Sequence, residues 1–318
     1  MKEEVAILLG SPVARAMRVY GGYAPSATFR VRLADGRRAF FKGVSAANNE
    51  FMRRGLEIEE RLYRDLGGDI VRWAPRYHGA VRADGWHALL LEDLGPADVP
   101  PWTVSNVRRA AHDYAAFHSA TSGNRLPKWL PRRQYWTSFT DRWRLLGAAP
   151  DDIDQLSGLA GTRRSEARAW LGEHIPVLQG AAERAAAIVG PSSLLHLDSR
   201  SDNLRTRGGL RLFDWNWVCV GPREFDVVEL AQSIAAEAGP QPETFVRAYR
   251  ERAELRDEAL DGLVAAIAGI FARGAWRPPP ADLPRVRTIQ RRQLRAALSW
   301  AARRLGLPEP GWLDAVPD

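Results

Sequence analysis

The chain has 318 residues, of which 45% are hydrophobic and 26% charged, an ordinary globular composition that excludes a wholly disordered protein. The net charge of +7 is spread out, with 15 basic and 11 acidic side chains in residues 1–92 and 30 and 27 in residues 93–318, so we expect no nucleic-acid partner. Because the chain is longer than the roughly 100–200 residues of one ordinary domain, we expect two lobes.

The apolar stretches are too short for a membrane protein. The longest uncharged one, residues 263–272, has ten residues, whereas a spanning helix needs ~20. The N-terminus has no secretory signal pattern. The single cysteine, Cys219, can form neither an internal disulfide nor a thiolate zinc site, and it lies in an apolar run. We therefore expect a cytoplasmic protein with Cys219 in its core and no membrane partner.

Residues 1–95 have the pattern of antiparallel strands with one helix. Alternating residues on both sides of an Asp-Gly turn predict a β-hairpin over residues 27–42, and a second hairpin has its second strand at 86–91. Between the hairpins, helical spacing predicts a helix that ends at Gly67-Gly68. Glycine and proline then break the pattern, so we place the lobe boundary after residue 95.

From residue 96 onward the pattern is mainly helical. A short strand-rich segment, residues 194–220, interrupts it with a turn at Gly208-Gly209. The predicted fold class is therefore α+β, with a larger, mainly helical second lobe. Helical spacing is clearest over residues 104–119, 165–189, 224–238 and 257–272.

The strand-rich segment contains the most specific motif of the sequence. His196, Asp198 and Asn203 follow the pattern H-x-D-x-x-x-x-N, and Phe213-Asp214-Trp215 comes shortly after. This spacing places a carboxylate and a carboxamide on one tight turn, and the next strand ends in a second carboxylate. Because Mg²⁺ prefers one or two carboxylates together with waters and phosphate oxygens, Asn203 and Asp214 suit an ion held jointly with a nucleotide. Asp198 is then left to accept a proton.

With these motifs the chain resembles the aminoglycoside phosphotransferase family, which are small-molecule kinases with a fold similar to that of protein kinases. The resemblance covers most of the chain and includes the segments 40–42, 89–95, 115–118 and 221–226. It implies a bilobal fold with a nucleotide-binding lobe over residues 1–95, containing an antiparallel sheet and one helix. A catalytic and substrate-binding lobe would cover residues 96–318. The chain departs from the family at Leu197, where glycine is common, and in a loop of small residues that replaces the protein-kinase glycine-rich motif.

The resemblance implies a role for each motif residue. Asp198 would orient or deprotonate the substrate hydroxyl, while Asn203 and Asp214 would hold Mg²⁺ on the phosphates of ATP or GTP. Lys42 would contact the α- and β-phosphates, and a helix carboxylate should fix it. Glu59 fits the family spacing best, with Glu57 and Glu60 as alternatives. Further nucleotide contacts are implied for the loop residues Gly21, Gly22 and Ser26 and for the backbone of Glu92 and Leu94.

Other residues have both a structural and a functional interpretation. His196 is expected to brace the catalytic loop. Asp226 resembles a helix-start aspartate that braces the same loop, and the alternative is a contact with substrate. Trp129, Trp136 and Trp143 recur every seven residues, which is typical of a buried helix face. The alternative is that these tryptophans form an aromatic wall for the acceptor.

Residues 224–261 carry ten acidic side chains and four arginines. Solvated helix faces would explain this composition. The alternative is an acidic rim that attracts a polycationic acceptor such as an aminoglycoside, because a cleft of one sign raises the local substrate concentration.

The resemblance implies a phosphotransferase that moves the γ-phosphoryl group of ATP or GTP to a hydroxyl of a small molecule. An aminoglycoside or another antibiotic would suit, and its modification would confer resistance. A metabolic alcohol or sugar is an alternative acceptor, and a catalytically silent nucleotide-binding protein is an alternative function. A protein kinase is disfavoured, because Gly221-Pro222 follows only seven residues after Asp214 and leaves little room for an activation loop. The acceptor, the choice between ATP and GTP, and the oligomeric state stay open.

Overall fold

The structure is a computed structural model that describes residues 1–20, 26–48, 50–123, 126–132, 139–187, 192–281 and 283–318. The chain divides into two units. Unit 1 comprises Met1–Val99 and Ser201–Val218, and unit 2 comprises Pro100–Arg200 and Cys219–Asp318. A segment from the middle of the chain therefore belongs to the same unit as the N-terminal strands, and it carries two of the expected site residues, Asn203 and Asp214.

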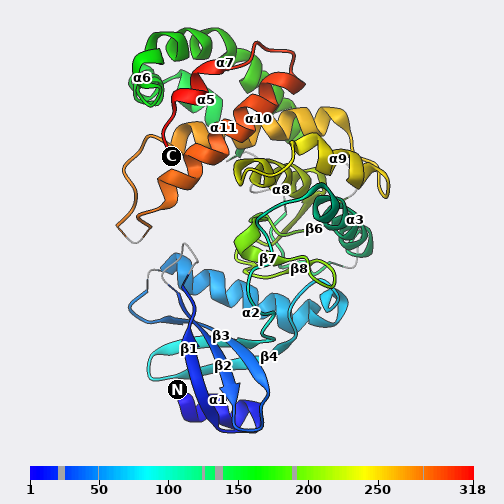
Figure 1. Cartoon of the computed structure of the whole chain (residues 1–318). Helices are drawn as coiled ribbons and strands as arrows, with labels where there is room; N and C mark the ends of the chain where they lie inside the picture. Colours follow the sequence, from blue (N-terminus) through cyan, green and yellow to red (C-terminus); the bar gives the residue numbers. More distant parts are fainter. Residues whose placement is uncertain (21–25, 49, 124–125, 133–138, 188–191, 282) are drawn as a thin grey trace. The chain divides into compact units, whose positions relative to one another are not determined.

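The predicted hairpins of unit 1 form one antiparallel sheet with the strand order β1-β2-β3-β5-β4 (Figure 1). Pairing of β2 with β3 and of β4 with β5 confirms both hairpins. The elements of this part are α1 (Lys2–Leu9), β1 (Val13–Arg18), β2 (Ala27–Leu33), β3 (Arg38–Ser45), α2 (Glu50–Ile70), β4 (Tyr77–Ala83) and β5 (Trp86–Leu91).

The two faces of this sheet have different neighbours. Residues opposite each other in adjacent strands share a face. Phe41 of β3 and Leu90 of β5 are such a pair, and they lie in a hydrophobic core with Val5 of α1. Because side chains alternate along a strand, the next pair, Lys42 and Leu89, lies on the opposite face. Strand alternation thus separates Lys42 from the core under α1.

Helix α2 continues beyond the point where the sequence predicts its end. We expected the helix to stop at Gly67-Gly68, but it runs to Ile70, so that prediction was wrong. Leu66 and Ile70 are four residues apart on one helix face and are 5% and 1% exposed. Burial of Ile70 contributes about 1.5–3 kcal/mol, which offsets the cost of about 1 kcal/mol for each glycine.

The central segment of unit 1 is a short hairpin. A single turn of 3₁₀ helix, η2 (Ser201–Asn203), leads into β7 (Leu204–Arg205), which pairs with β8 (Arg211–Leu212). Gly208 and Gly209 lie at its turn, as the sequence predicts.

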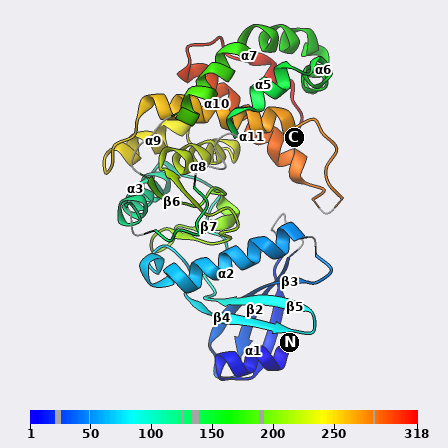
Figure 2. The ribbon, with the colours of Figure 1, turned by 180° about the vertical axis from the view of Figure 1, so that it is seen from behind.

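Unit 2 is mainly helical, and α3, α7, α8 and α10 correspond to the four predicted helices (Figure 2). An antiparallel sheet with a mainly helical remainder confirms the mixed α and β fold class. The elements are α3 (Val104–Ala120), α5 (Arg142–Gly147), α6 (Pro150–Gly158), η1 (Gly161–Arg163), α7 (Arg164–Ala187), β6 (Ser192–Leu195), β9 (Cys219–Pro222), α8 (Glu224–Ala236), α9 (Pro242–Arg250), α10 (Asp257–Gly274), α11 (Val286–Arg304) and η3 (Gly311–Ala315).

The core of unit 2 is built around α10. This helix packs against α7 and α11, and its residues Val264 and Ala268 are completely buried (Figure 2). Cys219 on β9 is buried as predicted, and burial raises the pKa of its thiol well above the usual value. In the described ranges, the structure contains no helix whose length and apolar character would allow it to cross a bilayer.

Candidate active site

Lys42 lies between two carboxylates in unit 1. Its Nζ atom is 2.5 Å from Oε2 of Glu59 on α2 and 2.6 Å from Oδ1 of Asp214. Glu59 is the partner that the sequence favours. The alternatives lie elsewhere, because Glu57 is exposed and Glu60 forms an ion pair with Arg82 of β4. The structure therefore brings three of the expected site residues together.

In this cluster, the pKa of Lys42 depends on the two carboxylates, and the pKa of Glu59 depends on Lys42. Lys42 is 8% exposed and Glu59 is completely buried. Burial opposes the charge of Lys42, but Asp214 and Glu59 outweigh burial and raise the pKa of the ammonium group above its usual value. Burial raises the pKa of Glu59, and Lys42 opposes that rise. Lys42 is therefore a fixed cation at neutral pH.

The β7–β8 hairpin brings the two proposed metal ligands close to each other in register. Leu204 pairs with Leu212, and the N–H of Phe213 donates to the carbonyl of Asn203 at 3.0 Å. Asn203 precedes the hairpin and Asp214 follows it, so both residues lie at its open end. Asn203 is 5% exposed.

Asp214 occupies an unusual backbone conformation. Its φ of 68° lies in the left-handed region, which aspartate tolerates better than most residues. The N–H of Asp214 donates to Oε1 of Glu59 at 3.2 Å, which ties this turn to α2. A carboxylate and a carboxamide at one hairpin end are oxygen donors of the kind Mg²⁺ takes when phosphates and waters supply its other ligands. The residues present thus fit a nucleotide-bound magnesium ion.

The remaining expected nucleotide contacts are of two kinds. Ser26 directly precedes β2 and is half-buried, whereas Gly21 and Gly22 lie outside the described residues. The N–H of Glu92 donates to the carbonyl of Arg76 at 2.8 Å, so a contact from Glu92 to a base would use its carbonyl oxygen. Leu94 lies two residues further on, outside regular structure.

Asp198 belongs to unit 2, where Arg200 holds it. Nε of Arg200 is 3.0 Å from Oδ1 of Asp198, and Nη2 donates to Oδ2 at 3.2 Å. Two contacts from one guanidinium group fix the orientation of a carboxylate. The N–H of Asp198 donates to Nδ1 of His196, which is completely buried, so His196 has the position of a loop brace.

Asp226 anchors the loop that carries Asp198. Its Oδ2 accepts the N–H of His196 at 2.8 Å, and its Oδ1 accepts the N–H of Leu197 at 2.9 Å. Nε2 of His118 on α3 lies 3.3 Å from Oδ2, and all of Asp226 is buried. This geometry favours the bracing interpretation over a contact with substrate.

Leu197, which stands where glycine is common, has a backbone conformation that favours glycine. Its φ of 58° lies in the left-handed region, where glycine carries no side-chain penalty. A leucine in this region costs of order 1–3 kcal/mol, and such a conformation persists only when its surroundings hold it. The side chain is 7% exposed, and the bond from its N–H to Asp226 supplies that constraint.

Sequence analysis missed Glu229, which lies one helical turn after Asp226. The N–H of Ser199 donates to its Oε2 at 3.3 Å. Burial, reinforced by the charges of Asp198 and Asp226, raises the pKa of Glu229 well above its usual value. The spacing of three residues on a helix was the available signal, because it places Glu229 beside Asp226.

The three tryptophans do not share one helix face. Trp143 on α5 is completely buried and donates from Nε1 to the carbonyl of Ala265 at 2.7 Å, as expected for a core residue. Trp129 is half-buried in a turn, so helical spacing was wrong for this position. Trp136 lies outside the described residues.

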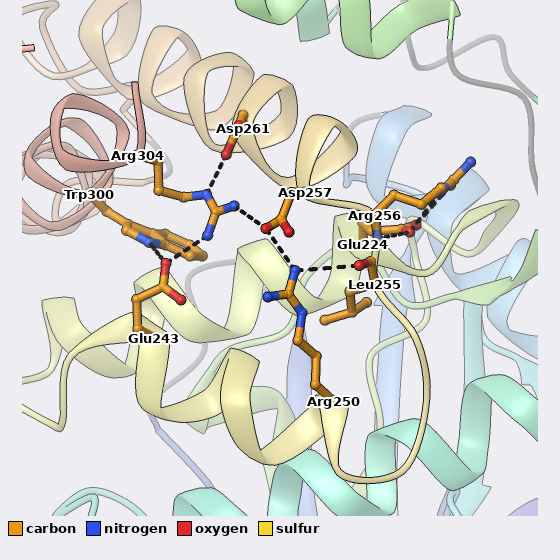
Figure 3. A network of polar contacts seen from close by, with 9 residues as sticks. All are labelled: Glu224, Glu243, Arg250, Leu255, Arg256, Asp257, Asp261, Trp300 and Arg304. Atoms are coloured by element: carbon orange, nitrogen blue, oxygen red, sulfur yellow. Dashed lines mark hydrogen bonds and ion pairs between the residues drawn. The ribbon is translucent and has the colours of Figure 1, made fainter. Parts of the chain in front are cut away.

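Ion pairs neutralise much of the acidic segment 224–261. Arg304 of α11 contacts Glu243, Asp257 and Asp261 at 2.8, 2.8 and 2.6 Å, and Figure 3 shows how it lies between them. Arg256 contacts Glu224 at 2.9 Å in the same view. These carboxylates join helices within unit 2, which does not favour an acidic rim for a polycationic acceptor.

Known proteins resemble the chain in sequence pattern and in fold. The model of the phosphotransferase enzyme family matches residues 17–260, which is most of the chain. A comparison with curated proteins finds no significant match.

Three solved structures illustrate the similarity in fold. A spectinomycin phosphotransferase in complex with ADP and spectinomycin has a TM-score of 0.59 and 12% identity, over 91% of this chain and 93% of that one. A putative fructosamine-3-kinase from Thermobifida fusca has a TM-score of 0.57 and 19% identity, over 93% and 98%. A choline/ethanolamine kinase family protein from Mesorhizobium loti has a TM-score of 0.56 and 16% identity, over 99% and 98%.

Proposed function

The chain belongs to the phosphotransferase enzyme family, and from this premise we propose that it transfers the γ-phosphoryl group of ATP or GTP to a hydroxyl of a small molecule. The observation that carries the proposal is the position of Lys42 between Glu59 and Asp214. A buried cation fixed by two carboxylates is suited to bind nucleotide phosphates. Phosphoryl transfer requires mainly positioning and cancellation of negative charge.

In this proposal Lys42 binds the α- and β-phosphates. Asn203 and Asp214 would hold Mg²⁺, which supplies further positive charge against the phosphates when bound. A unit charge at 4 Å is worth about 4 kcal/mol at an effective dielectric near 20, so each cation lowers the barrier substantially. The carbonyl of Glu92 and the backbone of Leu94 would bind the edge of the base, and Ser26 with the loop Gly21-Gly22 would contact the phosphates.

Asp198 is proposed as the general base. The acceptor oxygen bonds to the γ-phosphorus, the bond from that phosphorus to the bridging oxygen breaks, and the nucleoside diphosphate leaves. The hydroxyl proton passes to the carboxylate of Asp198. The ion pair with Arg200 supports this role, because it fixes the orientation of the carboxylate that receives the proton.

The acceptor is proposed to be a small molecule, for example an aminoglycoside or another antibiotic, whose modification would confer resistance. Structures of similar fold include a kinase solved with spectinomycin and others named for fructosamine and for choline or ethanolamine. Fold alone does not select among these chemical classes. The acidic side chains of residues 224–261 that pair with arginines do not by themselves favour a polycation.

A panel of antibiotics, alcohols and sugars tests the proposal. Each compound is incubated with Mg²⁺ and either ATP or GTP, and diphosphate release is read together with product mass. We expect one compound class to gain a phosphoryl group, and the Asp198→Asn variant to slow that gain by about 10²–10⁴-fold. If the protein binds nucleotide but modifies no compound, it is the silent nucleotide-binding protein instead.

A further inference from the structure

Residues 214–217, which follow β8, contact one face of α2. Phe51, Gly55 and Glu59 are four residues apart and so share a helix face. The ring centroids of Phe51 and Trp217 are 5.3 Å apart, and the carboxylate of Glu59 accepts the N–H of Asp214. Residues 214–217 therefore run along α2 in the opposite direction, and Asn216 lies opposite Gly55.

Asn216 contacts the same carboxylate oxygen as Lys42. Its Nδ2 donates to Oδ1 of Asp214, and Nζ of Lys42 lies 2.6 Å from that oxygen. Two donors on one oxygen fix the rotation of the carboxylate, and neither of these two contacts is made to Oδ2. We propose that Asn216 is a positioning residue that holds the carboxylate of Asp214 in its metal-binding orientation.

This inference rests on the proposed function, in which Lys42 binds nucleotide phosphates. Lys42 must then share its charge between the phosphates and Asp214. Asn216 carries no charge for the phosphates to attract, so its amide is the donor suited to hold Oδ1 while Lys42 binds phosphate. Partners of this kind, which orient a metal ligand without touching the metal, typically change metal affinity or activity by about 10–100-fold when they are removed.

Gly55 provides the space that Asn216 occupies. A Cβ atom at position 55 would lie 3.2 Å from Oδ1 of Asn216 and 3.3 Å from its Cγ, closer than ordinary van der Waals contact. A glycine inside a helix lowers stability by roughly 0.5–1 kcal/mol relative to alanine. The close approach of Asn216 gives a packing reason for a glycine at position 55. With a Cβ atom at position 55, the Asn216 amide would have to shift by a few tenths of an ångström.

The test measures metal-dependent nucleotide binding rather than turnover. Mg²⁺ is titrated into the full chain in the presence of a non-hydrolysable ATP or GTP analogue, and calorimetry gives the analogue's Kd with Mg²⁺ and with EDTA. Bound Mn²⁺ is counted separately by electron paramagnetic resonance. The variants are Asn216→Ala and Asn216→Leu, since leucine keeps the size without the donor, and Asn48→Ala is the control because its amide contacts Ser45.

For both Asn216 variants we expect a half-saturating Mg²⁺ concentration that is about 10–100-fold higher, with the Kd in EDTA unchanged. Asn48→Ala should behave as the wild type. Wild-type Mg²⁺ dependence in Asn216→Leu would overturn the inference and leave the proposed function intact. A wild-type chain that binds neither analogue would overturn the proposed function itself.

Gly55→Ala provides a second test that keeps the asparagine. This variant should weaken Mg²⁺ binding in the wild-type background and have no effect in Asn216→Ala, where the added methyl group meets no side-chain amide. Equal effects of Gly55→Ala in the two backgrounds would contradict the proposed role of Asn216, because the two residues would then act independently.

Discussion

Lys42 and Asp214 are 172 residues apart in sequence, yet Nζ of Lys42 lies 2.6 Å from Oδ1 of Asp214. The contact joins a central strand of the N-terminal sheet to the segment after β8 within unit 1. Together with Glu59 it forms a cluster of one cation and two carboxylates.

Replacing Lys42 tests both binding and stability. Lys42→Met leaves the completely buried Glu59 without its cation, so the free energy of unfolding should fall by about 3–5 kcal/mol. Denaturant titration measures the fall, and calorimetry should show lost nucleotide binding. Arg38→Ala, on the exposed end of the same strand, should change stability by less than about 0.5 kcal/mol. Unchanged stability of Lys42→Met would contradict the ion-pair argument.

Asp198→Asn should separate chemistry from binding. An amide has nearly the same shape as the carboxylate but cannot accept the hydroxyl proton, so kcat should fall by about 10²–10⁴-fold. Steady-state rates and calorimetry measure kcat and nucleotide Kd in parallel, and the Kd should stay the same. A variant with near-normal kcat would remove Asp198 from the role of base.

Asp226→Asn distinguishes bracing from substrate contact. An asparagine has one acceptor oxygen, so either the N–H of His196 or that of Leu197 loses its buried partner. Unfolding should become easier by about 1–3 kcal/mol. Because the side chain is completely buried, the acceptor KM should change little. A large rise in KM with full stability would instead support the substrate contact.

Arg304 and its neighbour Arg303 form a matched pair for stability measurements. The side chain of Arg304 is 12% exposed and contacts three carboxylates, whereas that of Arg303 is 46% exposed. Arg304→Ala should cost about 2–4 kcal/mol, below the full value for a buried pair because the partner carboxylates are partly solvated. Arg303→Ala should cost about 0–1 kcal/mol. Equal melting temperatures for the two variants would contradict this difference.

Glu224 should contribute to stability in a pH-dependent way. Burial opposes its ionisation, but hydrogen bonds from Arg256 outweigh burial and lower the pKa of Glu224 below its usual value. A carboxylate with a lowered folded-state pKa stabilises the protein above the unfolded pKa of about 4.3, and the contribution is lost as pH falls through the folded value. The stability difference between wild type and Glu224→Gln should therefore shrink from about pH 5 downward in denaturant titrations. A difference that stays constant with pH would refute the assignment.

Local patterns in the sequence predicted the elements more reliably than their ends. The hairpins of unit 1 follow from alternation and Asp-Gly turns, which act over a few residues. The end of α2 depended on the burial of Ile70, a tertiary effect that overrides the low helix propensity of Gly67 and Gly68. The prediction that Trp129 lies on a helix was wrong for a related reason. A spacing of seven residues alone does not show that a helix connects the positions.

The sequence by itself determined which chemical groups this protein has and the order in which they occur. The spacing of Asp198, Asn203 and Asp214 identified them as candidate site residues, since a short loop and a hairpin constrain such neighbours locally. Only the tertiary structure decided that Lys42 contacts Glu59 and Asp214, because such contacts depend on the packing of α2 against the sheet and on the bond from the segment after β8 to Glu59 of α2. It also decided the place of Asn216, whose role depends on a glycine that lies far away in the chain.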